Sequence, residues 1–143
     1  MRKAIPTLSA AALALVGLTA CGGSVFDLEV GQCANTADVE MDGGMIADLP
    51  ATDCEEPHDL EAYASTDLEG DEFPGDDVVG EQAWNFCETE FENFVGISLW
   101  DSEYGMEGFV PTADSWDDLG DRQVLCFVVS ADPVTGSLEG AAN

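Results

Sequence analysis

The clearest hydrophobic pattern lies in the middle of the chain, where apolar residues recur at steps of three or four across residues 78–94. This spacing predicts a helix with one apolar stripe facing the core. The stripe contains Val79, Ala83, Trp84, Cys87, Phe91 and Phe94. Asp76 and Asp77 come just before it and suit a helix N-terminus, because carboxylates accept bonds from its free amides and complement the positive end of the dipole. We therefore expect one main helix at about residues 76–94.

Strand patterns lie on both sides of this helix. Polar and apolar residues alternate across residues 58–66, which predicts a strand with one buried face. The continuous apolar run at residues 124–129 is typical of a central strand covered on both faces. Residues 25–30 and 108–111 have the composition of two shorter strands. Together these elements predict an α+β domain in which a small antiparallel or mixed sheet is packed by the main helix.

Other segments have the composition of loops and turns. Residues 34–52 are rich in glycine, aspartate and small side chains around Gly43-Gly44, which predicts a hairpin or an irregular loop. A short helical turn is expected at residues 112–119, capped by Thr112 and ended by Gly120. The tail at residues 133–143 is rich in glycine and alanine, and we expect it to fray.

The N-terminal segment has the pattern of a lipoprotein export signal. Arg2 and Lys3 give it a basic start, followed by an apolar run at residues 10–16 and by Leu18-Thr19-Ala20-Cys21. The apolar run is too short to cross a bilayer core of about 30 Å as a helix, so we interpret it as a removable targeting segment. The mature chain is expected to begin at Cys21, with at least two acyl chains on that residue for durable anchoring.

This interpretation sets the domain boundaries and the location. We expect a signal peptide at residues 1–20, a lipidated tether at 21–24, a folded domain at 25–138 and a tail at 139–143. The 123 residues that remain of 143 are enough for one domain with a modest core. The protein is expected at the cell membrane, on its extracytoplasmic face, held there by the lipid.

Four cysteines remain beyond the lipidated one, and an even number is typical of disulfides in an oxidising compartment. They allow three pairings, of which Cys33 with Cys54 and Cys87 with Cys126 is favoured. Cys87 lies on the apolar stripe of the helix, where a cysteine on the buried strand can meet it. A zinc site is the alternative, but no pair has Cys-x-x-Cys spacing and His58 is the only histidine.

Acidic residues dominate the charge of the chain. Asp and Glu number 30 against three Lys and Arg, which gives a formal net charge of −27 at pH 7. Removal of Arg2 and Lys3 leaves Arg122 as the only strong base, so the mature chain carries −29. Such a surface repels nucleic acid and anionic headgroups, which excludes the usual electrostatic routes to binding them. Because 45% of the residues are hydrophobic, the chain can still fold, and the acids then form a solvated surface. The favoured interpretation of this surface is solubility or adaptation to salt, and cation binding is the alternative.

Several segments together resemble one known family. They are Val30-Gly31-Gln32-Cys33, Cys54-Glu55-Glu56-Pro57-His58-Asp59, Phe73-Pro74-Gly75, Pro111-Thr112-Ala113-Asp114-Ser115-Trp116, Gly120-Asp121-Arg122-Gln123-Val124-Leu125-Cys126 and Gly136-Ser137-Leu138. On these motifs the chain resembles the septum-formation-related domain of exported and membrane-anchored actinobacterial proteins. The likeness covers roughly residues 25–138. It implies an extracytoplasmic domain associated with septation, and it carries over no catalytic residues.

The residue pattern favours a binding module over an enzyme. Only His58 could act as the base for a nucleophile, and Gly136-Ser137-Leu138-Glu139-Gly140 lacks the Gly-x-Ser-x-Gly spacing of a nucleophile elbow. No set of residues predicts a cofactor or a metal site. We therefore expect a non-enzymatic lipoprotein that binds an envelope protein or a cell-wall component. A hydrolase site formed by His58 and neighbouring acids is the less favoured alternative.

The candidate binding residues are aromatic or basic. In one alternative, Trp100, Tyr104 and Trp116 form an exposed platform that binds cell-wall glycan. The favoured role of Trp116 is instead to pack the short helix onto the core. Arg122 is expected to pair with Asp121 or with a buried carboxylate, and recognition of a partner is the alternative role.

Overall fold

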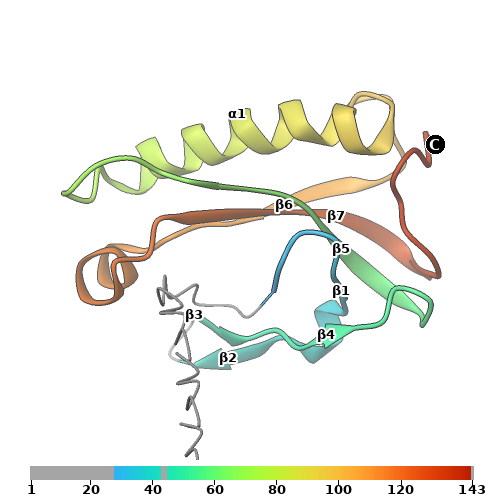
Figure 1. The fold of residues 1–143 in the computed structure, drawn as a ribbon, viewed down its shortest axis with the longest axis horizontal. Helices are drawn as coiled ribbons and strands as arrows, with labels where there is room; N and C mark the ends of the chain where they lie inside the picture. Colours follow the sequence, from blue (N-terminus) through green and yellow to red (C-terminus); the bar gives the residue numbers. More distant parts are fainter. Residues whose placement is uncertain (1–27, 43–44, 143) are drawn as a thin grey trace, which may run out of the picture.

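A five-stranded antiparallel sheet, in the order β4-β1-β5-β7-β6, organises the chain (Figure 1). The computed structural model describes residues 28–42 and 45–142. The strands of this sheet are β1 (Cys33–Ala34), β4 (Ala51–Thr52), β5 (His58–Asp67), β6 (Gly105–Phe109) and β7 (Gln123–Val134). One long helix, α1 (Asp76–Val95), lies across one face of the sheet. The predicted α+β class is therefore confirmed, and the sheet is antiparallel throughout.

Helix α1 begins and ends at glycines. Gly75 precedes it with a φ of 103°, and Gly96 ends it in the left-handed region with a φ of 90°, donating its N–H to the Glu92 carbonyl. The prediction of a helix at about residues 76–94 is confirmed. Asp76 and Asp77 lie inside the first turn, and no side chain caps the helix. The two aspartates therefore act through the helix dipole and not as capping acceptors.

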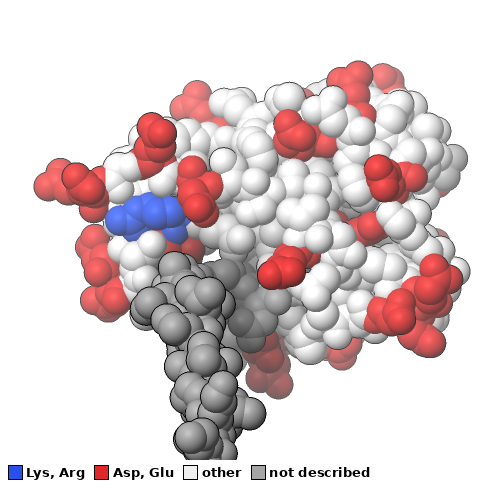
Figure 2. All heavy atoms as spheres, viewed as in Figure 1, with Lys and Arg blue, Asp and Glu red and all other residues white. Residues whose placement is uncertain are grey.

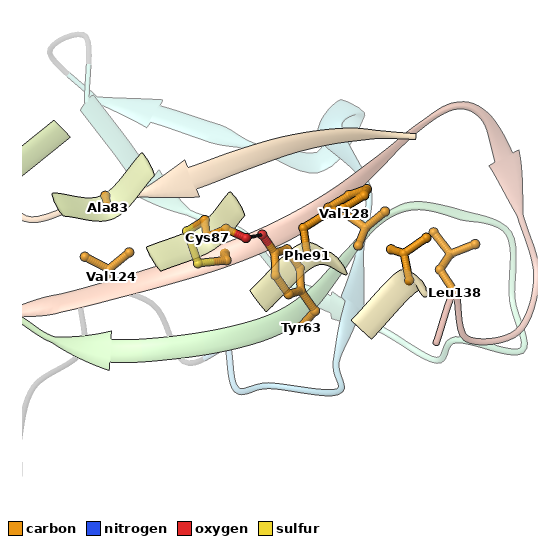
Figure 3. Packing of buried hydrophobic residues seen from close by; sticks show 9 residues of the cluster. Tyr63, Ala83, Cys87, Phe91, Val124, Val128 and Leu138 are labelled. Atoms are coloured by element: carbon orange, nitrogen blue, oxygen red, sulfur yellow. Dashed lines mark hydrogen bonds between the residues drawn. A yellow bond between two sulfur atoms is a disulfide. The ribbon is translucent and has the colours of Figure 1, made fainter. Parts of the chain in front are cut away.

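The sheet is buried on both faces along its centre. Under α1, a cluster of helix and strand side chains surrounds Tyr63 (Figure 3); its buried members are Tyr63, Ala83, Cys87, Phe91, Val95, Val124, Cys126, Val128 and Leu138. On the other face a second cluster contains Leu28, Ala34, Leu49, Leu60, Ala62, Leu125 and Phe127. Strand β7 contributes to both clusters, which confirms the prediction for residues 124–129 of a central strand.

Strand β5 differs from its predicted pattern. Its alternation predicted one buried face, but Glu61 and Tyr63 are buried together with Leu60 and Ala62. The reason is that Tyr63 lies under α1, whereas Glu61 is held by Ser137 and Leu138 of the C-terminal segment. The Tyr63 hydroxyl donates a hydrogen bond of 2.6 Å to the Cys87 carbonyl, which satisfies its polar end.

Both predicted disulfides are present. Cys33 on β1 is bonded to Cys54, and Cys87 on α1 is bonded to Cys126 on β7. The second bond ties the helix to the centre of the sheet, as the position of Cys87 on the apolar stripe predicted. The first closes the segment that contains the hairpin formed by β2 (Glu40–Asp42) and β3 (Met45–Asp48). Gly43-Gly44, expected at its tip, lies outside the described residues.

Of three shorter predictions, the structure corrects two and confirms one. Residues 28–30 lead into a turn in which the Gln32 N–H donates to the Glu29 carbonyl, so they form no strand, and residues 25–27 lie outside the described part. The strand expected at 108–111 begins and ends earlier, as β6. The helical turn expected at 112–119 is confirmed: the Thr112 Oγ1 accepts a hydrogen bond from the Ser115 N–H at 3.2 Å, a wide helical turn follows at Ser115–Leu119, and Gly120 ends it.

The tail is ordered and does not fray. Leu138 is buried in the core under α1, the Gly140 N–H donates to the Phe94 carbonyl, and the Ala142 N–H donates to the Val95 carbonyl, both at 2.8 Å. The last carbonyls of a helix lack partners within it, and the tail supplies two of the missing donors. Composition alone does not reveal such a docking contact.

The predicted export signal, the lipidated Cys21 and the tether all lie outside the described residues. Within residues 28–42 and 45–142, no helix has both the length and the apolar character needed to span a bilayer.

Candidate functional site

A solvent-open groove of about 230 Å³ lies between α1 and strand β6. The helix contributes Gly80, Ala83, Trp84 and Cys87 to its lining. Strand β6 contributes Met106, Glu107 and Gly108, and Val110 follows directly after the strand. Apart from Glu107, these side chains are apolar or absent. The groove is thus an apolar channel along one edge of the sheet.

Two glycines keep this groove open. A Cβ added at Gly80 would meet nothing within 4 Å, although Gly80 lies inside a helix where glycine costs about 1 kcal/mol relative to alanine. A Cβ at Gly108 would touch the Cys87 Sγ at an ordinary 3.6 Å. Neither glycine has a positive φ. Backbone geometry and packing therefore do not require glycine at either position, and the consequence of having it is open space above the Cys87–Cys126 disulfide.

Two exposed tryptophans stand beside the groove. Trp84 on α1 is 45% exposed and Trp100, in the segment after α1, is 75% exposed. Their ring centroids lie 6.3 Å apart with an interplanar angle of 46°. The Trp100 Nε1 donates a 2.7 Å hydrogen bond to the Glu88 Oε1, one turn after Trp84 on the same helix. This bond fixes the orientation of an indole that is otherwise in water.

The burial predicted for Trp84 is wrong. Its spacing places it on the edge of the apolar stripe, one residue after the buried Ala83 and three before the buried Cys87. A neighbour on the sheet would have to cover that edge, but the strand facing it has Gly108 where a side chain could reach across. Helical periodicity gives the stripe and does not show how far the opposing surface extends.

The predicted aromatic platform is also corrected. Trp100 is exposed as expected, and Tyr104 is half-buried against the cluster under α1. Trp116 is only 1% exposed, so it is not available on a surface platform. Its favoured role, packing the short helical turn onto the core, is the one that the structure supports. The exposed partner of Trp100 is Trp84, which the sequence pattern had assigned to the core.

Arg122 binds the Trp116 region through neutral groups. Its guanidinium carbon lies 3.6 Å from the centroid of the Trp116 ring. Its Nε donates to the Gly70 carbonyl at 3.2 Å, and one terminal nitrogen donates to the carbonyls of Trp116 and Asp121 at 3.0 and 2.8 Å. Trp116 in turn makes an edge contact with Phe73 at 5.7 Å. Arg122 therefore clamps the acidic loop before α1 to the turn at Ser115–Leu119.

The expected pairing of Arg122 with a carboxylate is wrong. Within the described ranges its guanidinium forms no ion pair. The Asp121 carboxylate instead accepts from the Ser115 hydroxyl and from the Gln123 N–H, so it shapes the turn that leads into β7. Residue composition could not distinguish these partners, since a lone arginine among 30 acids has many possible carboxylates nearby.

His58 lies inside the protein. Its side chain is fully buried, with the Nδ1 at 3.0 Å from the Glu56 carbonyl. A carbonyl only accepts hydrogen bonds, so the Nδ1 carries the proton. The Nε2 has no hydrogen-bond partner among residues 28–42 and 45–142. The ring thus lies at the start of β5 with one nitrogen hydrogen-bonded, and no solvent reaches it in this conformation.

Glu61 is a buried carboxylate that sequence reasoning missed. It is 2% exposed and accepts from the Ser137 hydroxyl at 2.7 Å and from the Leu138 N–H at 2.6 Å. Its carboxylate and the sulfurs of Cys33 and Cys54 lie within 4.8 Å of one another. Because the two sulfurs are bonded together they are not thiolates, and the carboxylate is already used to hold the C-terminal segment.

A family model described as septum formation matches residues 30–142. The chain belongs to the septum formation family. No curated protein and no solved structure matches the chain. The match starts near the described N-terminus and ends at the docked tail, so the groove, the tryptophan pair and the Arg122 clamp all lie within the septum formation domain.

Acidic side chains cover the surface of this septum formation domain. Figure 2 shows them spread over one face, with a single basic patch among them. Arg122 is the only Lys or Arg in the described part of the chain, and its Nε and one terminal nitrogen donate to carbonyls. Apart from Arg122, the charges on the described surface are therefore negative, and the apolar groove beside Trp84 and Trp100 interrupts them.

Proposed function

We propose that this protein is a non-enzymatic binding module on the outer side of the cytoplasmic membrane, where it is held by a lipid on Cys21 and engages an envelope protein. The septum formation domain indicates an envelope-associated or cell-division role. The observation that carries the proposal is the exposed Trp84–Trp100 pair beside an open groove. Membrane attachment rests on the N-terminal sequence pattern.

The tryptophan pair supports binding because exposed indoles are costly to leave in water and are the side chains that most often dominate interface energies. Trp100 is already held by Glu88, so less side-chain freedom is lost when a partner covers it. A groove of about 230 Å³ is smaller than the usual 300–1,000 Å³ of a small-molecule site. It has the dimensions of a recess for side chains of a partner.

The same surroundings argue against the hydrolase alternative. Glu107 is the one titratable residue in the groove lining, and its side chain lies on the face of β6 opposite Gly108 and the bonded Cys87. His58 is fully buried elsewhere. A nucleophile needs a base within hydrogen-bond reach, and the residues that line the groove do not supply such a pair.

Site-specific photo-crosslinking in living cells tests the proposal. A photoreactive amino acid is placed at Trp84 or Trp100, and a matched one at Leu119, which is 64% exposed and does not line the groove. We expect one envelope protein captured from positions 84 and 100 and not from 119. Mass spectrometry of the same material should show a diacylglyceryl group on Cys21. Equal capture at all three positions, or an unmodified and uncleaved N-terminus, contradicts the proposal.

A second candidate is binding of cell-wall glycan, favoured by the same two indoles at 6.3 Å, since sugar rings stack on exposed aromatic faces. The platform would then be formed by Trp84 and Trp100. Pull-down on purified peptidoglycan, compared between the wild type and Trp100→Ala, separates the two candidates. Retention on peptidoglycan that is lost in Trp100→Ala favours glycan, whereas no retention favours a protein partner.

A further inference from the structure

Strand β6 forms one edge of the five-stranded sheet. Its strand partner among the described residues is β7, and the sheet order ends at β6. An edge strand presents a row of backbone N–H and C=O groups that a further strand can pair with. The groove runs along this edge, and it has a helix on its other side. Extended peptides commonly bind in such a channel between an edge strand and a helix, by adding a strand to the sheet.

The side chains of β6 alternate between the two faces of the sheet. Gly108 faces α1, above the Cys87 sulfur, and Met106 packs against the cluster under α1. Phe109 lies on the other face, with its ring centroid 4.8 Å from that of Phe127. A strand added beside β6 has the same period of two. Every second side chain of that strand would therefore point toward the flank of α1, into the space beside Gly80 and Trp84.

Charge limits what the added strand can be. Glu107 is exposed on β6, Glu88 holds Trp100, and the chain carries −27 overall. A second copy of this chain would bring another acidic edge against Glu107, and like charges on adjacent strands are unfavourable. A basic segment gains from the surrounding carboxylates, and a Lys or Arg side chain can lie over an exposed indole face.

We propose that an extended basic segment of an envelope protein adds beside Gly105–Gly108 of β6, where no further strand lies among the described residues, placing an apolar side chain in the groove between Gly80 and Gly108 and a Lys or Arg against Trp84 and Trp100. This inference rests on the proposed function, because it names the chemistry of the partner at the same surface. The two glycines then have a role that the fold does not give them, since they make room for the apolar side chain.

Selection from a random library tests the chemistry of the segment. Dodecapeptides displayed on phage are selected on the purified full chain at moderate salt. We expect enriched peptides in which an apolar residue and a Lys or Arg stand two positions apart, so that both point toward α1. Synthetic copies should shift the emission of Trp84 and Trp100 to shorter wavelength, whereas Trp116 is already buried. Enrichment of acidic peptides, enrichment without this spacing, or no enrichment at all overturns the proposal.

Substitutions in the groove test where the peptide binds. Gly80→Leu fills open space on a helix, so we expect a higher melting temperature together with at least a tenfold loss of affinity for the selected peptide. The matched control is Gln82→Leu, which adds the same side chain to α1 outside the groove lining and should change the affinity less than twofold. Peptide binding that survives Gly80→Leu places the site elsewhere and refutes the proposal.

Charge and backbone variants test the mode of binding. Glu107→Lys should weaken binding at least tenfold, and Glu92→Lys, on an exposed part of α1 outside the groove, should weaken it far less. N-methylation of alternate peptide residues should abolish binding in one register, since those amides would pair with β6. Tolerance of N-methylation in both registers excludes strand addition. Self-association of the chain that protects β6 amides from hydrogen exchange would instead identify a second copy as the occupant.

The outcomes separate this inference from the proposed function. Crosslinking in cells at Trp84 and Trp100 with no binding of basic strands leaves a binding module whose partner has a different chemistry. If the selected peptides bind tightly but no envelope protein is crosslinked in cells, the groove has the proposed preference for basic strands, and the proposed function is contradicted.

Discussion

Replacing Arg122 should destabilise the domain more than loss of any other exposed charge. Arg122 is the one strong base of the described chain, and it stacks on the buried Trp116 ring while it donates to three carbonyls. These contacts join the loop at Gly70 to the turn that ends before β7. Arg122→Ala removes all of them and leaves the carbonyls of Trp116 and Gly70 to find water.

The size of the effect follows from the contacts. Hydrogen bonds from a charged donor contribute about 1.5–3 kcal/mol each when fully buried, and less here because Arg122 is half-exposed. The stacking on Trp116 adds about 0.5–2 kcal/mol. Since contacts of one side chain are not additive, we expect Arg122→Ala to lower the free energy of unfolding by about 2–4 kcal/mol. Arg122→Lys keeps the charge but not the planar fork, and should cost about 1–2 kcal/mol.

Urea unfolding followed by tryptophan fluorescence measures both variants, and salt identifies the mechanism. The partners of Arg122 are carbonyls and a ring, not carboxylates, so the loss in Arg122→Lys should stay within about 0.5 kcal/mol between 0.1 and 1 M sodium chloride. A loss that disappears at high salt would falsify this account and restore a carboxylate partner. A loss below about 0.5 kcal/mol in Arg122→Ala would show that the clamp contributes little.

Three other predictions concern the core and the surface. Replacing both Cys87 and Cys126 by alanine opens a link across 39 residues and should lower the free energy of unfolding by about 4 kcal/mol, as measured by urea unfolding with and without reductant. Burial raises the pKa of Tyr63 well above its usual range, and the charge of Glu90 raises it further. The folded state thus holds a proton that the unfolded state releases above about pH 10, so stability should fall as the pH rises past 10, and Tyr63→Phe should remove this part of the fall. Finally, the melting temperature of the wild type should rise with sodium chloride as like charges are screened, and a flat response from low to molar salt contradicts the salt-adapted surface.

The parts of the fold that the sequence predicted are those that local periodicity controls. The helix at residues 76–94, the central strand at 124–129 and the meeting of Cys87 with Cys126 follow from apolar spacing on single elements. The wrong predictions concern the residues that face a helix or strand from a neighbouring element. Trp84 was placed in the core because its own helix cannot show that the facing strand has Gly108 there.

Polar partners were harder to predict than apolar contacts. Glu61 appeared as the exposed member of an alternating strand, although it holds Ser137 and Leu138 from 76 and 77 residues away. Arg122 was assigned a carboxylate, yet its partners are backbone carbonyls, which every residue has and which no composition distinguishes. Long-range hydrogen bonds to the backbone leave no local signal in a sequence.

Three features that each reduce stability occur together at the edge of this domain. Gly80 weakens a helix where a Cβ would meet nothing within 4 Å, Trp100 exposes three quarters of an indole to water, and β6 has no further strand beside it among residues 28–42 and 45–142. Each can be removed by a simple substitution, such as alanine at position 80 or a polar residue at position 100. Sequences that are locally consistent elsewhere tend to break such rules at functional sites. Each feature alone has only a small effect on stability. Because all three lie around one groove, the edge beside Trp84 is a stronger candidate for binding than the acidic surface around it.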